Sequence, residues 1–146
     1  MIFFRKQSQI NKKMKSDNAI KIFLLLLLTV CLFHVFIILK IIPYNIAWGG
    51  RLTNDTEMYI FETVSILVNL FLCWILLMKG EFVKFRFSPK IVRIILWLFC
   101  ILFILNTAGN IFAKTNFEKC FSLLTGLSAI LIWMILKQKH PIRDKK

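Results

Sequence analysis

The sequence predicts an all-α membrane protein, an antiparallel four-helix transmembrane bundle with both termini in the cytoplasm. Three observations support this fold. Hydrophobic residues make up 58% of the 146 residues, and the mean hydropathy of +0.72 is too high for an ordinary soluble domain. Four apolar runs, each near the roughly 20 residues that cross a bilayer, are separated by polar connections. The Lys and Arg residues gather in alternate connections, which indicates the orientation.

The chain begins with a basic segment, residues 1–21, in which Asp17 is the only acidic residue. We expect it to form a cytoplasmic tail that contacts anionic lipid headgroups, with an interfacial helix on that lipid as an alternative. The apolar run that follows is longer than the hydrophobic part of a usual signal peptide, and no small-residue cleavage site comes after it. We therefore expect this run to remain in the protein as a membrane span.

The first and second spans are expected at residues 22–42 and 58–78 within a membrane domain that covers residues 22–136. Pro43 should stop the first span, because proline cannot continue a helix. The connection between the two spans contains Gly49-Gly50, a pair that permits a tight turn. The second span should end at Lys79-Gly80.

The third and fourth spans are expected at residues 91–113 and 120–136, and a basic cytoplasmic tail covers residues 137–146. Ser88-Pro89 is a helix start signal before the third span. The fourth span has small residues at four-residue intervals, a spacing that lets helices pack closely in lipid. These residues are Ser122 with Gly126 and Thr125 with Ala129.

The distribution of positive charge predicts the topology. The two tails and the middle connection hold sixteen of the 20 Lys and Arg residues. The other four are Lys40, Arg51, Lys114 and Lys119, in the two remaining connections. By the positive-inside rule, those two connections face outward. The composition, rich in Ile, Lys, Phe and Asn, is compatible with an AT-rich bacterial genome, and we expect a bacterial cytoplasmic membrane.

The second span carries a polar stripe. Its members, Glu62, Ser65, Asn69 and Cys73, are three or four residues apart and so share one helix face. A carboxylate in lipid is costly, so Glu62 should be protonated, paired or exposed to water in a cavity. His34 in the first span and Arg51 in the connection are its candidate partners.

Polar residues of all four spans lie in the outer half of the membrane, whereas the inner half is almost entirely apolar. This asymmetry predicts an outward-facing polar pocket that binds a lipid headgroup or a small amphipathic molecule. Proton exchange by Glu62 and His34 is a related possibility. The candidate pocket residues are His34, Trp48, Arg51, Glu62, Asn69, Asn106 and Asn110.

Structural explanations stand beside this hypothesis. The Asn residues are typical of hydrogen bonding between helices, and Glu62 and His34 can form a purely structural pair. Two alternative functions are a proton- or cation-coupled transporter or channel subunit that acts as an oligomer, and a structural subunit of a membrane complex. Transport by one bundle is disfavoured, because the inner halves of the helices offer no polar path.

Other function classes lack a signature. No nucleophile with a base and no metal-ligand spacing is evident, so an enzyme that acts on lipid stays an alternative but is disfavoured, and we predict no cofactor and no metal site. The basic clusters lack an aromatic-plus-basic motif, so we predict no nucleic-acid partner and expect a homo-oligomer or a membrane-protein partner at most. Asn54-Asp55-Thr56 matches the N-glycosylation pattern, which matters only in a eukaryotic secretory membrane.

Several segments together resemble a group of small four-span bacterial membrane proteins of uncharacterised function. They are Trp48-Gly49-Gly50-Arg51, Phe61-Glu62, Asn69, Asn106-Thr107-Ala108-Gly109-Asn110 and Phe117-Glu118-Lys119. The resemblance covers nearly the whole chain outside its tails. It implies the four-span fold and carries no activity, ligand or cofactor.

Overall fold

The structure is a computed structural model that describes residues 2–46, 48, 51–84, 87–112 and 116–137. These residues form four α-helices and a short 3-10 helix, and no strand occurs among them. The predicted all-α fold with four apolar helices is confirmed. The elements are α1 (Ile2–Ile38), η1 (Tyr44–Ile46), α2 (Asp55–Lys79), α3 (Pro89–Ile111) and α4 (Asn116–Lys137).

Each of the four helices is long and apolar enough to cross a bilayer. The candidate spans are Asp17–Ile38, Asp55–Lys79, Pro89–Ile111 and Lys119–Lys137. Three predictions lie outside the described residues: the turn at Gly49-Gly50, the end of the third span at Ala113 and the tail 138–146. The expected division between a tail and the first span falls within α1, which runs through residue 21 as one helix.

The first span ends earlier than the sequence predicted, at Ile38 rather than residue 42. Lys40 has a left-handed backbone with φ of 57°. Its N–H bonds to the carbonyl of Ile37 at 2.8 Å, and the next N–H bonds to the carbonyl of Phe36 at 2.9 Å. This hydrogen-bond pattern is a Schellman ending, which closes the helix before the chain reaches Pro43. The prediction that Pro43 stops the helix is wrong.

The start of α2 is fixed by side chains of the preceding connection. The Asn54 side-chain oxygen accepts a hydrogen bond from the Glu57 backbone N–H at 2.9 Å. The Glu57 carboxylate in turn accepts hydrogen bonds from the backbone N–H and hydroxyl of Thr53 at 2.9 and 3.0 Å. These bonds satisfy N–H groups that a helix start leaves without partners. They extend α2 three residues before the predicted start at residue 58.

The other end of α2 again uses a residue other than glycine in the left-handed region, Glu81 with φ of 61°. Gly80 itself has an ordinary helical φ of −78°. Its lack of a side chain serves packing, because a Cβ at Gly80 would lie 2.5 Å from the Phe82 ring and 3.3 Å from Ile20. Gly80 therefore lets α1 and the residues after α2 approach closely.

The predicted start signal of the third span is confirmed. The Ser88 hydroxyl accepts a hydrogen bond from the backbone N–H of Ile91 at 3.3 Å, and Pro89 occupies the first turn of α3. Proline fits there because its missing N–H would have no partner in the helix. The helix thus begins two residues before the predicted span boundary.

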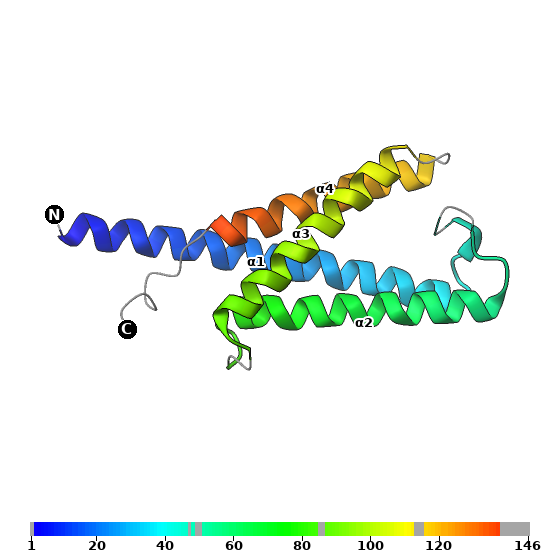
Figure 1. Ribbon diagram of the computed structural model, residues 1–146, viewed down its shortest axis with the longest axis horizontal. Coiled ribbons are helices and arrows are strands. Elements are labelled where there is room, and N and C mark those ends of the chain that lie inside the picture. The colour runs from blue at the N-terminus through cyan, green and yellow to red at the C-terminus, as the bar shows by residue number, and fades with distance from the viewer. Residues whose placement is uncertain (1, 47, 49–50, 85–86, 113–115, 138–146) are drawn as a thin grey trace.

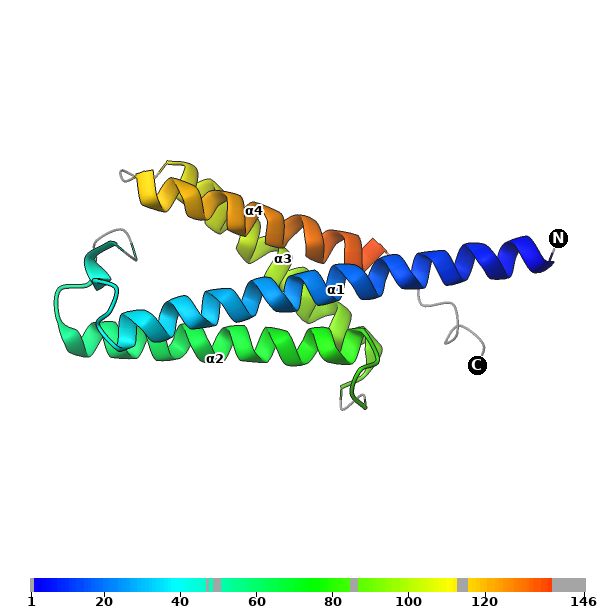
Figure 2. The same cartoon turned by 180° about the vertical axis from the view of Figure 1, so that it is seen from behind.

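The helices form two pairs, α1 with α2 and α3 with α4, which lie side by side within each pair (Figure 1). The pairs converge at one end, where α2 ends and α3 begins, and diverge at the other (Figure 1, Figure 2). We call the first the closed end and the second, which carries residues 39–46, 48 and 51–54, the open end. This geometry separates the polar residues of the two pairs.

The main apolar core lies at the closed end. Each helix contributes at least one side chain with 0% exposure: Ile20, Leu76, Leu96 and Ile132. A smaller cluster of Ile37, Leu52 and Met58 packs the connection against α1 and α2 at the open end. Because the four helices meet mainly at the closed end, the core there determines how the pairs are arranged.

The small residues of α4 lie against α3, as predicted for close helix packing. The Thr107 hydroxyl donates to the Thr125 hydroxyl at 2.9 Å, and a Cβ at Gly126 would lie 3.6 Å from Thr107. Ala129 is buried, and its carbonyl oxygen accepts from the Cys100 thiol at 3.7 Å. Small side chains allow this approach in a bilayer, where association depends on packing and hydrogen bonds.

The closed-end core makes a specific prediction for stability. Leu96→Ala should lower the free energy of unfolding by about 2–5 kcal/mol, because it opens a cavity among all four helices. Leu98→Ala on the same helix is the control, since its side chain is 56% exposed. It should change stability by about 0.5 kcal/mol or less. Unfolding in lipid or mild detergent measures both, and equal losses would contradict the assigned core.

Candidate functional site

Glu62 is the buried carboxyl group around which the candidate site is built. It lies on α2, on the side that faces α1, and its exposure is 0%. A carboxyl group at such a position is stable only when other groups replace the hydrogen bonds of water. Its two oxygen atoms have different partners, one from α1 and one from the connection between the helices.

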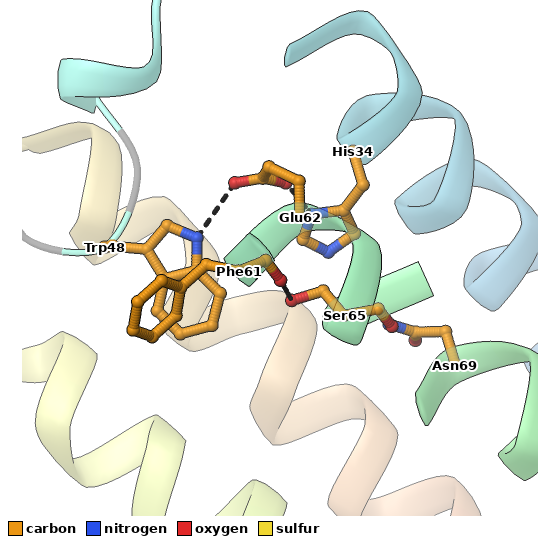
Figure 3. Close-up of polar contacts among 6 residues, drawn as sticks. All are labelled: His34, Trp48, Phe61, Glu62, Ser65 and Asn69. Atoms are coloured by element: carbon orange, nitrogen blue, oxygen red, sulfur yellow. Dashed lines mark hydrogen bonds and ion pairs between the residues drawn. The ribbon is translucent and has the colours of Figure 1, made fainter. Parts of the chain in front are cut away.

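The first partner is His34 of α1, whose Nδ1 contacts Oε2 of Glu62 (Figure 3). A carboxylate accepts hydrogen bonds, so this contact orients Nδ1–H toward Glu62. The second ring nitrogen, Nε2, points away from the carboxyl group (Figure 3). The His34 side chain retains 15% exposure. The predicted pairing of His34 with Glu62 is therefore present.

The second partner is Trp48, whose Nε1–H donates to Oε1 of Glu62 at 2.9 Å (Figure 3). Its ring also packs edge-on against Phe61, with ring centroids 5.1 Å apart. Trp48 has a left-handed backbone with φ of 56°, which is unfavourable for a bulky side chain. The hydrogen bond and the ring contact compensate for this backbone, and they hold the connection against α2.

The structure brings together three of the seven predicted site residues: His34, Trp48 and Glu62. Arg51, the alternative partner of Glu62, is exposed, and its backbone N–H donates to the Trp48 carbonyl at 3.3 Å. Among the described residues, His34 rather than Arg51 therefore contacts the Glu62 carboxyl group.

The predicted Asn residues lie apart from this cluster. Asn69 donates to the backbone carbonyl of Ser65 at 2.8 Å, and Ser65 donates to the carbonyl of Phe61 at 2.9 Å (Figure 3). Two members of the polar stripe, Ser65 and Asn69, are thus satisfied by their own helix. Asn106 is exposed and Asn110 partly buried on α3, in the other helix pair. The sequence predicted a similar depth in the membrane for these Asn residues and Glu62, but they do not contact Glu62.

Two contacts between polar side chains that join helices were not predicted from the sequence. One is the Thr107–Thr125 bond already described, although the spacing of Thr125 had marked the face of α4 on which it occurs. The other joins Lys40 to Asp55, with 2.5 Å between Nζ and Oδ2. The two side chains are about half exposed, at 51% and 52%, so their contact connects the end of α1 to the start of α2 at the protein surface.

The chemistry available to the His34–Glu62–Trp48 cluster follows from its geometry. The carboxyl group fixes the imidazole, which leaves Nε2 to accept a hydrogen bond or a proton. Among the described residues, no group of three or more His, Cys, Asp and Glu side chains is placed to hold a metal ion. Comparison of the chain with protein-family models, curated proteins and solved structures gave no match.

The ion pair at the open end gives a prediction for alkaline pH. The hydrogen bond to Asp55, aided by its charge, raises the pKa of Lys40 above the ordinary lysine value. The contact should therefore stabilise the fold below that ordinary value and be lost as the pH rises through the raised pKa. Asp55→Asn should return the Lys40 pKa toward its ordinary value, measured by NMR of the ammonium nitrogen. Glu57→Gln should leave it unchanged.

The Trp48 contact gives a second prediction. Trp48→Phe should lower the free energy of unfolding by about 1–3 kcal/mol, because it leaves one buried Glu62 oxygen without its donor. Trp97→Phe is the matched control, since Trp97 is exposed on α3. Thermal unfolding of both variants in the same detergent checks this difference. Equal stability of the two variants would show that the Trp48 bond does not hold the connection.

Proposed function

We propose that this chain is a multi-pass protein of a bacterial cytoplasmic membrane, with its helices antiparallel and its closed end toward the cytoplasm. The distribution of charge supports this orientation, because sixteen of the 20 Lys and Arg residues belong to the tails and the middle connection. At the closed end, Lys137 lies 3.6 Å from the ring centroid of Trp133, a pairing suited to a headgroup interface. Anionic lipids would then contact the basic tails.

We propose further that the protein binds the polar headgroup of a lipid or small amphipathic molecule at the open end, through His34. The observation that carries this proposal is the buried Glu62 carboxyl group held by an imidazole and an indole. A single carboxyl–imidazole contact would suffice to join two helices. Here a loop residue with an unfavourable backbone completes the cluster, and His34 remains partly exposed.

The cluster favours one class of headgroup. With Nδ1 directed at Glu62, Nε2 accepts a hydrogen bond from a hydroxyl or an ammonium group. The Glu62 carboxylate, on the opposite side of the imidazole ring from Nε2, also attracts a cation. This attraction is strong in a site of low dielectric constant. We therefore favour a hydroxyl- or amine-bearing headgroup over an anionic one.

The alternative of transport through a single bundle has less support. Conduction needs a polar path to the closed end, and the core described there consists of apolar side chains from all four helices. The alternative of a structural subunit makes a different prediction, because it requires no bound molecule. Detection of a retained ligand therefore separates binding from scaffolding.

The experiment is native mass spectrometry of the protein extracted gently from its own membrane. The wild-type protein should retain a small amphipathic molecule, and Glu62→Gln and His34→Gln should each reduce its occupancy by about tenfold, equivalent to 1.4 kcal/mol of binding free energy. The reason is that either change disturbs the orientation of Nε2 or removes it.

Glu57→Gln is the matched control, because it makes the same substitution on the same helix at a residue that caps α2. It should retain the ligand. A wild-type protein without any ligand, or a ligand retained equally by all variants, would overturn the proposal. The first result would favour a structural or ion-conducting role and direct work to partner identification and flux assays.

A further inference from the structure

A groove of about 850 Å³ lies at the divergence of the two helix pairs, between α1, the start of α4 and the connection after α1. None of the seven predicted site residues is among the described residues that line it. The α1 wall consists of Ile22, Leu25, Leu26, Thr29, Val30 and Phe33. The remaining wall is formed by Ile41–Pro43 and Ile46 of the connection and by Cys120, Phe121 and Leu124 of α4.

The groove wall is suited to hydrocarbon. Among the described residues of the wall, Thr29 is the one with a hydroxyl, and this hydroxyl donates to the carbonyl of Leu25 at 3.1 Å, within its own helix. Cys120 adds a thiol, which behaves as a small apolar group. A polar ligand would lose its hydrogen bonds to water and find almost no partners here. The occupant must therefore be apolar along this wall.

The length of the groove matches a lipid chain. From Ile22 to Phe33 the wall follows about 16 Å of α1, which is roughly half the thickness of a hydrocarbon core of about 30 Å. These residues all belong to the candidate span Asp17–Ile38, so the groove lies at membrane depth. Its volume is within the usual range of small-molecule sites, about 300–1,000 Å³.

We propose that this groove binds one acyl chain of a phospholipid from the leaflet at the open end. Lys119 is exposed next to Cys120 at the α4 side of the groove, where a lipid phosphate would be placed. This proposal does not rest on the His34 site, since that cluster uses the α2 side of α1.

The first experiment uses the wild-type protein in vesicles of phosphatidylethanolamine and phosphatidylglycerol in which a fraction of the lipid carries a diazirine in the middle of one acyl chain. After irradiation, peptide mass spectrometry locates the labelled residues. Labelling should be enriched on Leu25–Val30 and Phe121–Leu124. The comparison segment is Ile101–Leu105 of α3, which is also largely exposed. Equal labelling of all three segments would overturn the proposal.

The second experiment compares neighbouring leucines on α4. Leu124 lines the groove, whereas Leu123 is 75% exposed and does not. Leu124→Trp should fill the groove and reduce phospholipid retained in native mass spectrometry by about tenfold, whereas Leu123→Trp should leave it unchanged. If Leu124→Trp instead converts a dimer to a monomer with lipid retention unchanged, a second copy occupies the groove and the proposal is wrong.

The two sites can fail separately. Glu62→Gln should leave the labelling of the groove by the diazirine lipid unchanged, and Leu124→Trp should leave a headgroup ligand at His34 bound. If Leu124→Trp does not fold, the labelling pattern of the wild-type protein alone decides whether the groove holds an acyl chain.

Discussion

The open end of the structure depends on the hydrogen bonds that replace water around one buried carboxyl group. Glu62 has no exposed surface, and its surroundings at the open end are otherwise largely apolar. His34 of α1 and Trp48 of the connection supply the hydrogen bonds that water would otherwise make to this carboxyl group. These two hydrogen bonds therefore join α1 to α2 and hold the connection against α2. At the closed end, the helices associate through apolar packing instead.

Much of the fold follows from the sequence because membrane constraints act locally. The length of each apolar run predicts a span, and Ser88-Pro89 predicts where α3 begins. The predicted end of the first span was wrong because the residue with a left-handed backbone after α1 is Lys40. No glycine marks this helix end in the sequence. The expected division at residue 21 has no counterpart in the helix, since basic residues are good helix formers and α1 continues through them. The hydrophobicity of the side chains thus predicted the presence of the spans better than it predicted where each span begins or ends.

The candidate site was predictable in part for a related reason. Depth in the membrane placed His34 and Glu62 at similar levels, and adjacent helices made their contact plausible. Depth alone could not show that α3 diverges from α2 at this level, which leaves Asn106 and Asn110 in the other pair. The Trp48 bond depends on a left-handed backbone that neighbouring contacts stabilise, at a local cost of about 1–3 kcal/mol. Such tertiary compensation has no sequence signature.

The connection after α1 belongs to two sites at once. Ile46 forms part of the groove wall, and two residues later Trp48 donates its hydrogen bond to Glu62. Because one short segment contributes to both, it must meet two requirements at once, an apolar side chain toward the groove and an indole directed at Glu62.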